Sequence, residues 1–441
     1  MEPVSDFLKA SVWHGTLERS VAILAAHPEV AAANVHVAAI LGDNTTVRRF
    51  IAVDPSSAVA KGGPLGWDPL TCLCFSKYLR LEPHRSPAFL DAAMALLDAG
   101  ASASTGFFSK ENEAAPDWES ALYGAAGVAH HAELTRLLLE RGANPNDGEV
   151  TYHSPESFGL GVIEALVGSG TLTADSLATM LLRKADWHHH EGITFLLAHG
   201  ANPNHMTLWG LTALHQAIRR DNALRNIEAL LNHGADPAVA STGGKSSVAL
   251  AARRGRRDVL ELFHQRSIRT ELQGVERLIA ACARSNDAGV RTITNAEPNL
   301  VRELAAEGGQ LLAEFAGNDN AEGVGLLLDL GVPVDARFAE GDGYWEVATD
   351  STALHVAAWR ASHATVKLLI GRGASVDARD GKDRTPLALA VRACVDSYWT
   401  ELRKPDSVAA LLDTGASADD VLFPSGYAEV DKLLARRRQR A

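Results

Sequence analysis

The chain has 441 residues, and 46% of them are hydrophobic, which is typical of a folded protein. Its formal net charge of −12 argues against nucleic acid as the main partner, because binding to phosphates needs a cationic surface. The most apolar stretch, residues 21–41, is interrupted by polar residues, and the N-terminus lacks the basic and apolar regions of a signal peptide. These features exclude a membrane-spanning chain and predict a cytoplasmic protein.

The first 33 residues predict a helical cap at one end of the fold. Apolar residues such as Phe7, Leu8 and Val21 recur at helical spacing there, and polar residues separate them. Residues 34–53 predict a first pair of helices, and residues 67–105 predict a longer pair. Residues 106–118 exceed a normal turn, so we expect an inserted loop there.

Further pairs of short helices are predicted along the middle of the chain. Their apolar residues again recur at helical spacing, at 119–147, 151–170, 173–204 and 210–239. Between 243 and 337 the glycine signals fade, but three more pairs are predicted at 248–263, 278–293 and 311–330. A second inserted loop is expected at 338–349.

Residues 350–380 contain the clearest helix pair of the chain. Thr352 is suited to cap the first helix with its hydroxyl, and Gly373 is suited to the left-handed backbone that ends the second. Such a pair cannot bury its apolar face alone, so it needs neighbours of the same design. A stretched pair follows at 383–419, and residues 420–441 predict a C-terminal cap with a basic tail.

Two short motifs recur in phase with these pairs. The opening Thr-Ala-Leu-His at 352–355 returns at 212–215, and Thr385 to Ala388 is a variant of it. The Gly-Ala-Ser close at Gly373 returns in related form at Gly100, Gly142, Gly200, Gly234, Gly331 and Gly415. Gly200 and Gly234 lie 34 residues apart, close to the period of about 33 of ankyrin repeats. The chain therefore resembles the ankyrin repeat family.

The resemblance implies an all-α ankyrin repeat solenoid of about eleven repeats, with helical caps at residues 1–33 and 420–441. The repeat array would cover residues 34–419 as one elongated domain. In this family a concave groove, lined by turns and inner helices, binds partners. His215 and His355 occupy the histidine of the opening motif, which the family uses to hydrogen-bond the neighbouring turn.

Aromatic and acidic residues gather just before several helix openings. If the repeats stack in register, these residues line one groove and bind a partner, because Trp and Tyr are common interface anchors and carboxylates suit cationic groups. Packing over the inner helices is the alternative. The candidate binding residues are Trp67, Asp68, Asp117, Trp118, Glu119, Trp209, Asp342, Tyr344, Trp345 and Glu346.

Other charged residues have less specific interpretations. Arginines that follow inner helices, such as Arg254 and Arg360, are expected to remain solvated near helix ends, with binding of acidic groups as the alternative. His188, His189 and His190 are consecutive, so they cannot all face one ion on a helix. We expect them to form the solvated start of an outer helix, and we predict no metal site. The four scattered cysteines are expected to be reduced core thiols. No cofactor motif is present, so we expect no cofactor.

The leading hypothesis is an adaptor or scaffold that binds a protein or peptide, with a preference for basic side chains. The second is an enzyme or small-molecule-binding protein with an acid–base site in the groove between the two insertions. Its catalytic candidates are Asp68, Glu119, Glu346, Asp350 and His188, with Asp117, Tyr152, His153 and Asp186 as further proton donors or acceptors of the groove. Arg-rich and Ala-rich usage suggests a bacterial source. The partner and the oligomeric state stay open at this point.

Overall fold

The local signals of the clearest repeat produce the expected structure. Helix α23 (Ala353–Trp359) begins after Thr352, whose backbone N–H and hydroxyl lie 3.1 and 2.8 Å from Nδ1 of His355. Helix α24 (His363–Gly371) runs back beside it, and Gly373 follows with a left-handed φ of 84°. Since Nδ1 of His355 accepts these bonds, its Nε2–H donates to the carbonyls of Ala378 and Arg384, both at 3.0 Å. The predicted role of this histidine in fastening the next turn is confirmed.

The computed structural model describes residues 3–109, 117–268 and 271–440, and it divides into two compact units. Unit 1 comprises Met1–Arg220 and Glu228–Ala235, and unit 2 comprises Asp221–Ile227 and Asp236–Ala441. Helix α15 (Leu224–Asn232) is divided between them. The predicted all-α solenoid is confirmed, because helices α1 to α27 account for most of the described chain.

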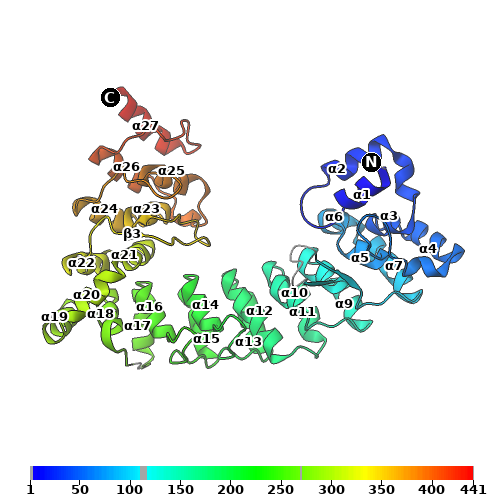
Figure 1. Cartoon of the computed structure of the whole chain (residues 1–441), viewed down its shortest axis with the longest axis horizontal. Coiled ribbons are helices and arrows are strands. Elements are labelled where there is room, and N and C mark those ends of the chain that lie inside the picture. Colours follow the sequence, from blue (N-terminus) through cyan, green and yellow to red (C-terminus); the bar gives the residue numbers. More distant parts are fainter. Residues whose placement is uncertain (1–2, 110–116, 269–270, 441) are drawn as a thin grey trace. The chain divides into compact units, whose positions relative to one another are not determined.

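Unit 1 consists of short helices that follow one another in pairs. Figure 1 shows α10 and α12 in one row, with α11 and α13 in a second row beside it. A π-helical turn, η4, continues α8. The elements are α1 (Pro3–Ala10), α2 (Glu18–Ala26), α3 (Val35–Ile40), α4 (Asn44–Val53), α5 (Pro69–Cys74), α6 (Lys77–Leu81), α7 (Ser86–Asp98), β1 (Gly106–Phe108), β2 (Trp118–Ser120), α8 (Ala121–Tyr123), η4 (Gly124–Val128), α9 (Ala132–Glu140), α10 (Gly148–His153), α11 (Gly161–Gly168), α12 (Ala174–Asp186), α13 (His190–Ala198) and α14 (Ala213–Arg219).

Unit 2 also consists of short helices in pairs, including the region where the sequence lacks the closing glycines. In Figure 1 the pairs α21/α22, α23/α24 and α25/α26 succeed one another toward the C-terminal helix. The remaining elements are α16 (Ser247–Arg253), α17 (Arg257–Gln265), α18 (Gly274–Ala283), α19 (Asp287–Ala296), α20 (Asn299–Ala306), α21 (Gly308–Gly317), α22 (Ala321–Asp329), β3 (Arg337–Phe338), β4 (Ser351–Thr352), α25 (Pro386–Asp396), α26 (Asp406–Thr414) and α27 (Ala428–Arg440). The observed pairs are consistent with about eleven repeats.

The closing glycines adopt the backbone that the sequence predicted. The backbone φ of each closing glycine lies between 84° and 102°, a region that residues with a Cβ rarely adopt. These glycines are Gly100, Gly142, Gly200, Gly234, Gly331, Gly373 and Gly415. Ser267 takes the same kind of conformation after α17, with φ 56°. A serine at this position explains why no glycine marks that repeat.

Both insertions form antiparallel β-hairpins where the structure describes them. Strands β1 and β2 pair within the first insertion, although residues 110–116 lie outside the described residues. Strands β3 and β4 flank the second insertion, and a bridge joins Asp342 to Val347 inside it. The sequence predicted the positions of these insertions as loops, but it did not predict the strands.

The core consists of small and aliphatic side chains on the facing sides of the helices. All four cysteines, Cys72, Cys74, Cys282 and Cys394, are free and buried, as predicted. Burial raises the pKa of the Cys282 thiol to about 12 and that of Cys394 to about 11, so these thiols stay protonated at neutral pH. Among the described residues, we find no helix with the length and apolar character needed to cross a membrane.

Candidate functional site

The β1/β2 hairpin gives its two faces different environments. Phe107 pairs with Glu119 and Phe108 pairs with Trp118, so each pair shares one face of the hairpin. Phe107 stacks on Trp67 with ring centroids 4.1 Å apart, on the inner side. Phe108 and Trp118 lie on the other side, 61% and 37% exposed, in an edge-to-face contact at 4.9 Å. The hairpin therefore presents an aromatic pair to solvent.

Two of the predicted binding residues have structural roles instead. Trp67 is buried in an aromatic cluster with Phe75 and Phe107. Asp68 is also buried and caps α5, because its carboxylate accepts hydrogen bonds from the N–H of Thr71 at 2.9 Å and from the hydroxyl of Thr105. These contacts favour the packing alternative for Trp67 and Asp68.

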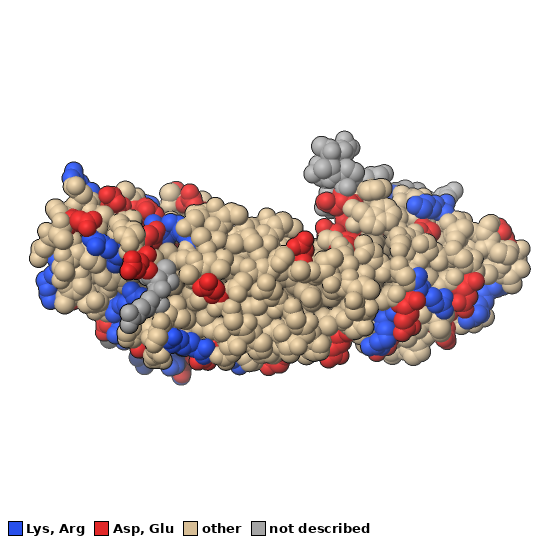
Figure 2. All heavy atoms as spheres, turned by 90° about the horizontal axis from the view of Figure 1, so that it is seen from below, with Lys and Arg blue, Asp and Glu red and all other residues tan. Residues whose placement is uncertain are grey.

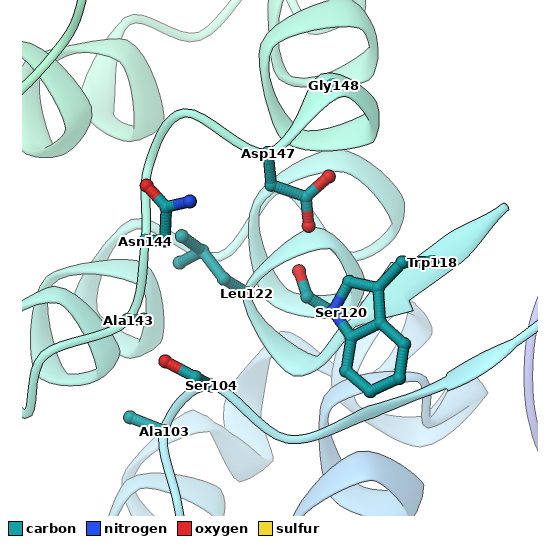
Figure 3. Close-up of a pocket in the computed structure, with 9 residues that line it drawn as sticks. All are labelled: Ala103, Ser104, Trp118, Ser120, Leu122, Ala143, Asn144, Asp147 and Gly148. Carbon is teal, nitrogen blue, oxygen red and sulfur yellow. The ribbon is translucent and has the colours of Figure 1, made fainter.

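A recess of about 260 Å³ lies beside the outer face of the hairpin. Figure 3 shows the ring of Trp118 on one side, with the Asp147 carboxylate and the Ser120 side chain directed toward the same space. The recess is lined by Ala103, Ser104, Trp118, Ser120, Leu122, Ala143, Asn144, Asp147 and Gly148. Its walls combine apolar surface with one carboxylate, a composition suited to a side chain with an apolar stem and a polar end.

Glu119 lies on the inner face of the hairpin, and carboxylates of several neighbouring segments act on its charge. Its side chain is only 7% exposed, and its buried Oε2 has no hydrogen-bond partner among the described residues. Burial, together with the nearby carboxylates of Glu149, Asp117 and Asp147, raises the pKa of Glu119 to about 7. At neutral pH the group is therefore divided between its neutral and charged forms.

A chain of ion pairs continues from Glu149 along the inner helices of unit 1. His153 lies 3.3 Å from Glu149 and 3.0 Å from Glu156, and Arg183 donates to Glu156 at 2.8 Å. Arg183 also pairs with Asp186, which accepts from Nε of Arg220 at 2.9 Å; the two pairs complete a ladder from Glu149 to Arg220.

The ladder fixes the charge of its histidine. Burial alone would lower the pKa of His153, but hydrogen bonds to Glu149 and Glu156 outweigh burial and raise this pKa to about 9. The imidazole is thus positively charged at neutral pH and is held by two glutamates. The structure connects the predicted candidates His153 and Asp186 through Glu156 and Arg183. The sequence analysis did not identify Glu156 or Arg183 as part of a site.

Exposed aromatic side chains accompany the ladder. Trp209, a predicted binding residue, is 41% exposed, and its ring lies 5.5 Å from that of Tyr152. Arg183 covers the Tyr152 ring at 3.9 Å. Phe158 and Trp187 are 64% and 40% exposed and lie 6.5 Å apart. Phe108, Phe158 and Trp187 were not predicted from the sequence.

The three consecutive histidines have separate environments. His188 has a left-handed φ of 53°, whereas His189 is buried and its Nδ1 lies 2.8 Å from Nζ of Lys184. Burial lowers the pKa of Lys184 to about 8. The expectation of a solvated histidine run is wrong for His189. Across residues 3–109, 117–268 and 271–440, no group of three or more His, Cys, Asp or Glu side chains is arranged to hold a metal ion.

The remaining predicted residues belong to unit 2, on the second hairpin. Trp345 is buried, with its ring 5.3 Å from Trp399, while Tyr344 is 37% exposed and contacts Trp345 edge to face. The backbone N–H of Tyr344 donates to Asp342 at 3.0 Å. The contact of Trp345 with Trp399 attaches the second hairpin to the segment that follows α25.

The two acidic residues that follow have partners within unit 2. Glu346 pairs with Arg392 at 2.7 Å. Asp350 is exposed, and its backbone carbonyl accepts from Arg337 at 2.7 Å. Glu346 and Asp350 therefore lie in a different unit from the catalytic candidates Asp68, Glu119 and His188.

The expectation that arginines at inner helix ends remain solvated is wrong for Arg254 and Arg360. Both are buried and converge on Asp221, with Arg254 donating at 2.8 and 2.6 Å and Arg360 at 3.0 and 3.1 Å. Burial would raise the pKa of Asp221, but the charges of Arg254 and Arg360 outweigh burial and hold it well below its usual range. Arg360 also lies over the rings of Trp345 and Trp399, with its guanidinium carbon 4.2 and 4.5 Å from their centroids. The aromatic rings of unit 2 therefore already hold a cation of the chain itself.

Charges of both signs occur on the face of the molecule shown in Figure 2. On the face shown in Figure 2, uncharged residues cover a wide area, and Lys and Arg side chains lie next to Asp and Glu side chains, without a broad positive area among the described residues. This face lacks the cationic stripe that nucleic acid binding requires.

Family models match two stretches of the chain. A family model of ankyrin repeats in three copies matches residues 181–274, and a model of the single ankyrin repeat matches residues 349–381. Among solved structures, the crystal structure of the human ASB11 ankyrin repeat domain is similar, with 21% sequence identity and a TM-score of 0.24. The match covers 54% of this chain and 98% of that one. The chain therefore contains ankyrin repeats at residues 181–274 and 349–381, and capped helix pairs and left-handed closing glycines recur outside these two stretches.

Proposed function

We propose that this protein is a binding scaffold that holds a protein segment against the inner helices and the first hairpin of unit 1. Ankyrin repeats generally mediate protein–protein interaction, which supports a scaffold at the coarse level. The use of unit 1, and of these residues, is our inference from their exposure and charge.

The observation that carries the proposal is the set of solvent-facing aromatic pairs beside acidic groups. Phe108 contacts Trp118, Tyr152 contacts Trp209, and Phe158 lies near Trp187, each pair with at least one ring more than a third exposed. Exposed aromatic rings of this kind are unusual on a surface that contacts only water, and they anchor many protein interfaces. The adjoining carboxylates Asp117 and Glu149 favour a partner with basic residues.

A phage-displayed library of random peptides, selected on the full chain, tests this proposal. We expect selected peptides to carry apolar residues and to lose about tenfold or more in affinity for a Trp118→Ala, Trp187→Ala double variant. Far-ultraviolet circular dichroism should show that the variant keeps its helices. Peptides that bind the double variant as tightly as the original chain would contradict the proposal.

Acid–base catalysis is the second candidate, and one observation favours it. Glu119 has a pKa of about 7, which suits a general acid or base near neutral pH. Asp68, however, is engaged as a helix cap, and Glu346 and Asp350 belong to unit 2. Glu119 is therefore the residue on which a catalytic role in unit 1 would depend.

A further inference from the structure

The side chain of Lys184 is fully buried in unit 1 and ends at a histidine. Lys184 lies on α12, and its Nζ donates to the carbonyl of Ser157 at 2.6 Å. Nζ also lies 2.8 Å from Nδ1 of His189, at the start of α13, which runs back beside α12 (Figure 1). Lysine is rarely buried to this degree, and its ammonium group needs acceptors inside the protein. Ser157 and His189 supply two of them.

The contact with Lys184 fixes the protonation state of His189. An ammonium group only donates hydrogen bonds, so Nδ1 of His189 accepts, which requires the neutral imidazole with its proton on Nε2. Nε2 lies 3.6 Å from a carboxylate oxygen of Glu191. A second proton, on Nδ1, would place two positively charged donors 2.8 Å apart between two buried residues. The contact therefore holds only while His189 is neutral.

Tight packing on the α13 side prevents Lys184 and His189 from moving apart. Gly192 of α13 faces both groups, and a Cβ at this position would lie 2.6 Å from Cδ of Lys184 and 2.9 Å from Nδ1 of His189. The backbone of α13 thus touches the lysine stem and the edge of the imidazole, which only glycine allows. A repulsion between the two groups has to be relieved elsewhere, and Ser157 and Phe158 lie against them from the preceding segment.

Lys184 and His189 hold residues 157–160 against the two helices. The carbonyl of Ser157 accepts from Lys184, and the ring of Phe158 lies 5.2 Å from the ring of His189. Phe158 is nevertheless 64% exposed, and it forms the solvent-facing pair with Trp187. Breaking the contact between Lys184 and His189 therefore removes the support of this aromatic pair.

We propose that Lys184, His189 and Ser157 form an acid-sensitive latch. A proton from solvent binds Nδ1 of His189, the hydrogen bond from Lys184 breaks, and residues 157–160 separate from α12 and α13. The latch is closed at neutral pH and opens as pH falls below about 6.5, where a histidine in water takes up its second proton. The opening needs no partner, but its effect on binding at Phe158 and Trp187 rests on the proposed function.

The charged groups around His189 agree with this direction. Lys184 faces it from α12, Glu191 and His190 face it from α13, and residues 157–160 carry no titratable side chain. Burial and the charge of Lys184 lower the pKa of His189, and they outweigh the opposite effect of Glu191. The closed form therefore binds the proton more weakly than the open form, so the closed form loses stability as pH falls through about 6.5.

Two other groups near the latch titrate. Lys184 has a pKa of about 8, so it stays charged between pH 5.5 and pH 6.5 and adds no pH dependence there. His130, which precedes α9, faces Lys184 from another side, and burial lowers the pKa of His130 as well. An experiment on the latch therefore has to separate His189 from His130.

Hydrogen–deuterium exchange of the full chain without a partner tests the latch. Protection factors of residues 154–160 and of the start of α13, corrected for the intrinsic pH dependence of exchange, should fall about fivefold from pH 6.5 to pH 5.5, because opening takes up one proton. His189→Asn keeps an oxygen that accepts from Lys184 but does not titrate, so its protection should stay constant within about twofold. His130→Asn and His190→Asn are the matched controls and should keep the fivefold fall.

A second measurement does not depend on any variant. Nuclear magnetic resonance of the original chain with ¹⁵N-labelled histidine should show His189 as the neutral Nε2–H tautomer at pH 6.5. A charged ring, or an Nδ1–H tautomer, would overturn the latch.

The outcomes for the latch are separate from those of the peptide selection. Protection that does not change with pH in the original chain, or a fall that persists in His189→Asn or disappears in His130→Asn, would overturn the latch and leave the scaffold standing. If the fivefold fall depends on His189 but the library gives no peptide that depends on Trp118 and Trp187, the latch stands and the proposed function fails.

Discussion

At the scale of single residues, burial and pairing decide what each charged group does. Asp221 and Arg360 lie 139 residues apart in sequence, yet they form a buried ion pair within unit 2. The sequence analysis placed Arg360 at the end of an inner helix and expected it to be solvated. It could not predict the pair, because no local pattern links residues that far apart.

We expect Asp221→Asn to destabilise unit 2 by about 3–5 kcal/mol, because it leaves Arg254 and Arg360 buried without their counter-charge. Asparagine tolerates the left-handed backbone of Asp221, so the change tests charge alone. Urea unfolding followed by circular dichroism gives the measurement. Asp287→Asn, which removes the exposed pair with Arg291, is the control and should cost about 0–1 kcal/mol. Equal costs for both variants would contradict the buried network.

Glu119→Gln should change stability in a pH-dependent direction. The folded-state pKa of Glu119 is raised to about 7, so the folded protein binds a proton more tightly than the unfolded chain and loses stability as pH rises from about 4.5 to 7. Glutamine removes this loss. The variant should match the original chain at pH 5 and exceed it by about 1–3 kcal/mol at pH 8. Thermal unfolding at both pH values measures the difference, and a variant that is less stable at pH 8 would refute the burial of an unpaired carboxylate.

At the scale of helices and hairpins, the repeat signals predict most of the fold. The Thr-Ala-Leu-His openings and the closing glycines locate the caps and turns of the helix pairs, because each signal satisfies a local backbone requirement. The strands of the two hairpins were missed, since a few residues of pairing leave no periodic pattern. The exposed pair of Phe108 and Trp118 was missed in part for the same reason: which face a residue takes depends on strand register.

Two adjacent leucines of α24 test the packing of the clearest repeat. Leu369 is fully buried, so Leu369→Ala should cost about 2–5 kcal/mol. Leu368 is half-buried, so Leu368→Ala should cost about 1 kcal/mol. The shift of the urea midpoint measures both. A larger shift for Leu368→Ala would mean that the helix presents a different face to its neighbours.

The tryptophans of the two hairpins should respond differently to removal. Trp345 is buried against Arg360 and Trp399, so Trp345→Ala should lower the free energy of unfolding by about 3–5 kcal/mol. Trp118 is partly exposed, so Trp118→Ala should cost about 1 kcal/mol or less. Similar losses in differential scanning calorimetry would show that the first hairpin also needs its tryptophan for folding.

At the scale of the whole molecule, the two units have different surface chemistry. In unit 2, Trp345 and Trp399 contact Arg360 of the chain itself, while Tyr398 is 72% exposed. Unit 1 retains exposed aromatic pairs and a buried carboxylate without a donor. The sequence analysis treated residues 34–419 as one array with one groove, because repeat motifs carry no information about where an array divides into compact units.

Hydrogen–deuterium exchange of the full chain with a library-selected peptide tests the binding surface most directly. The account predicts slower exchange of backbone amides in β2 and α10, around Glu119 and Glu149, with little change in unit 2. Protection confined to helices of unit 2, with β2 and α10 unchanged, would contradict it.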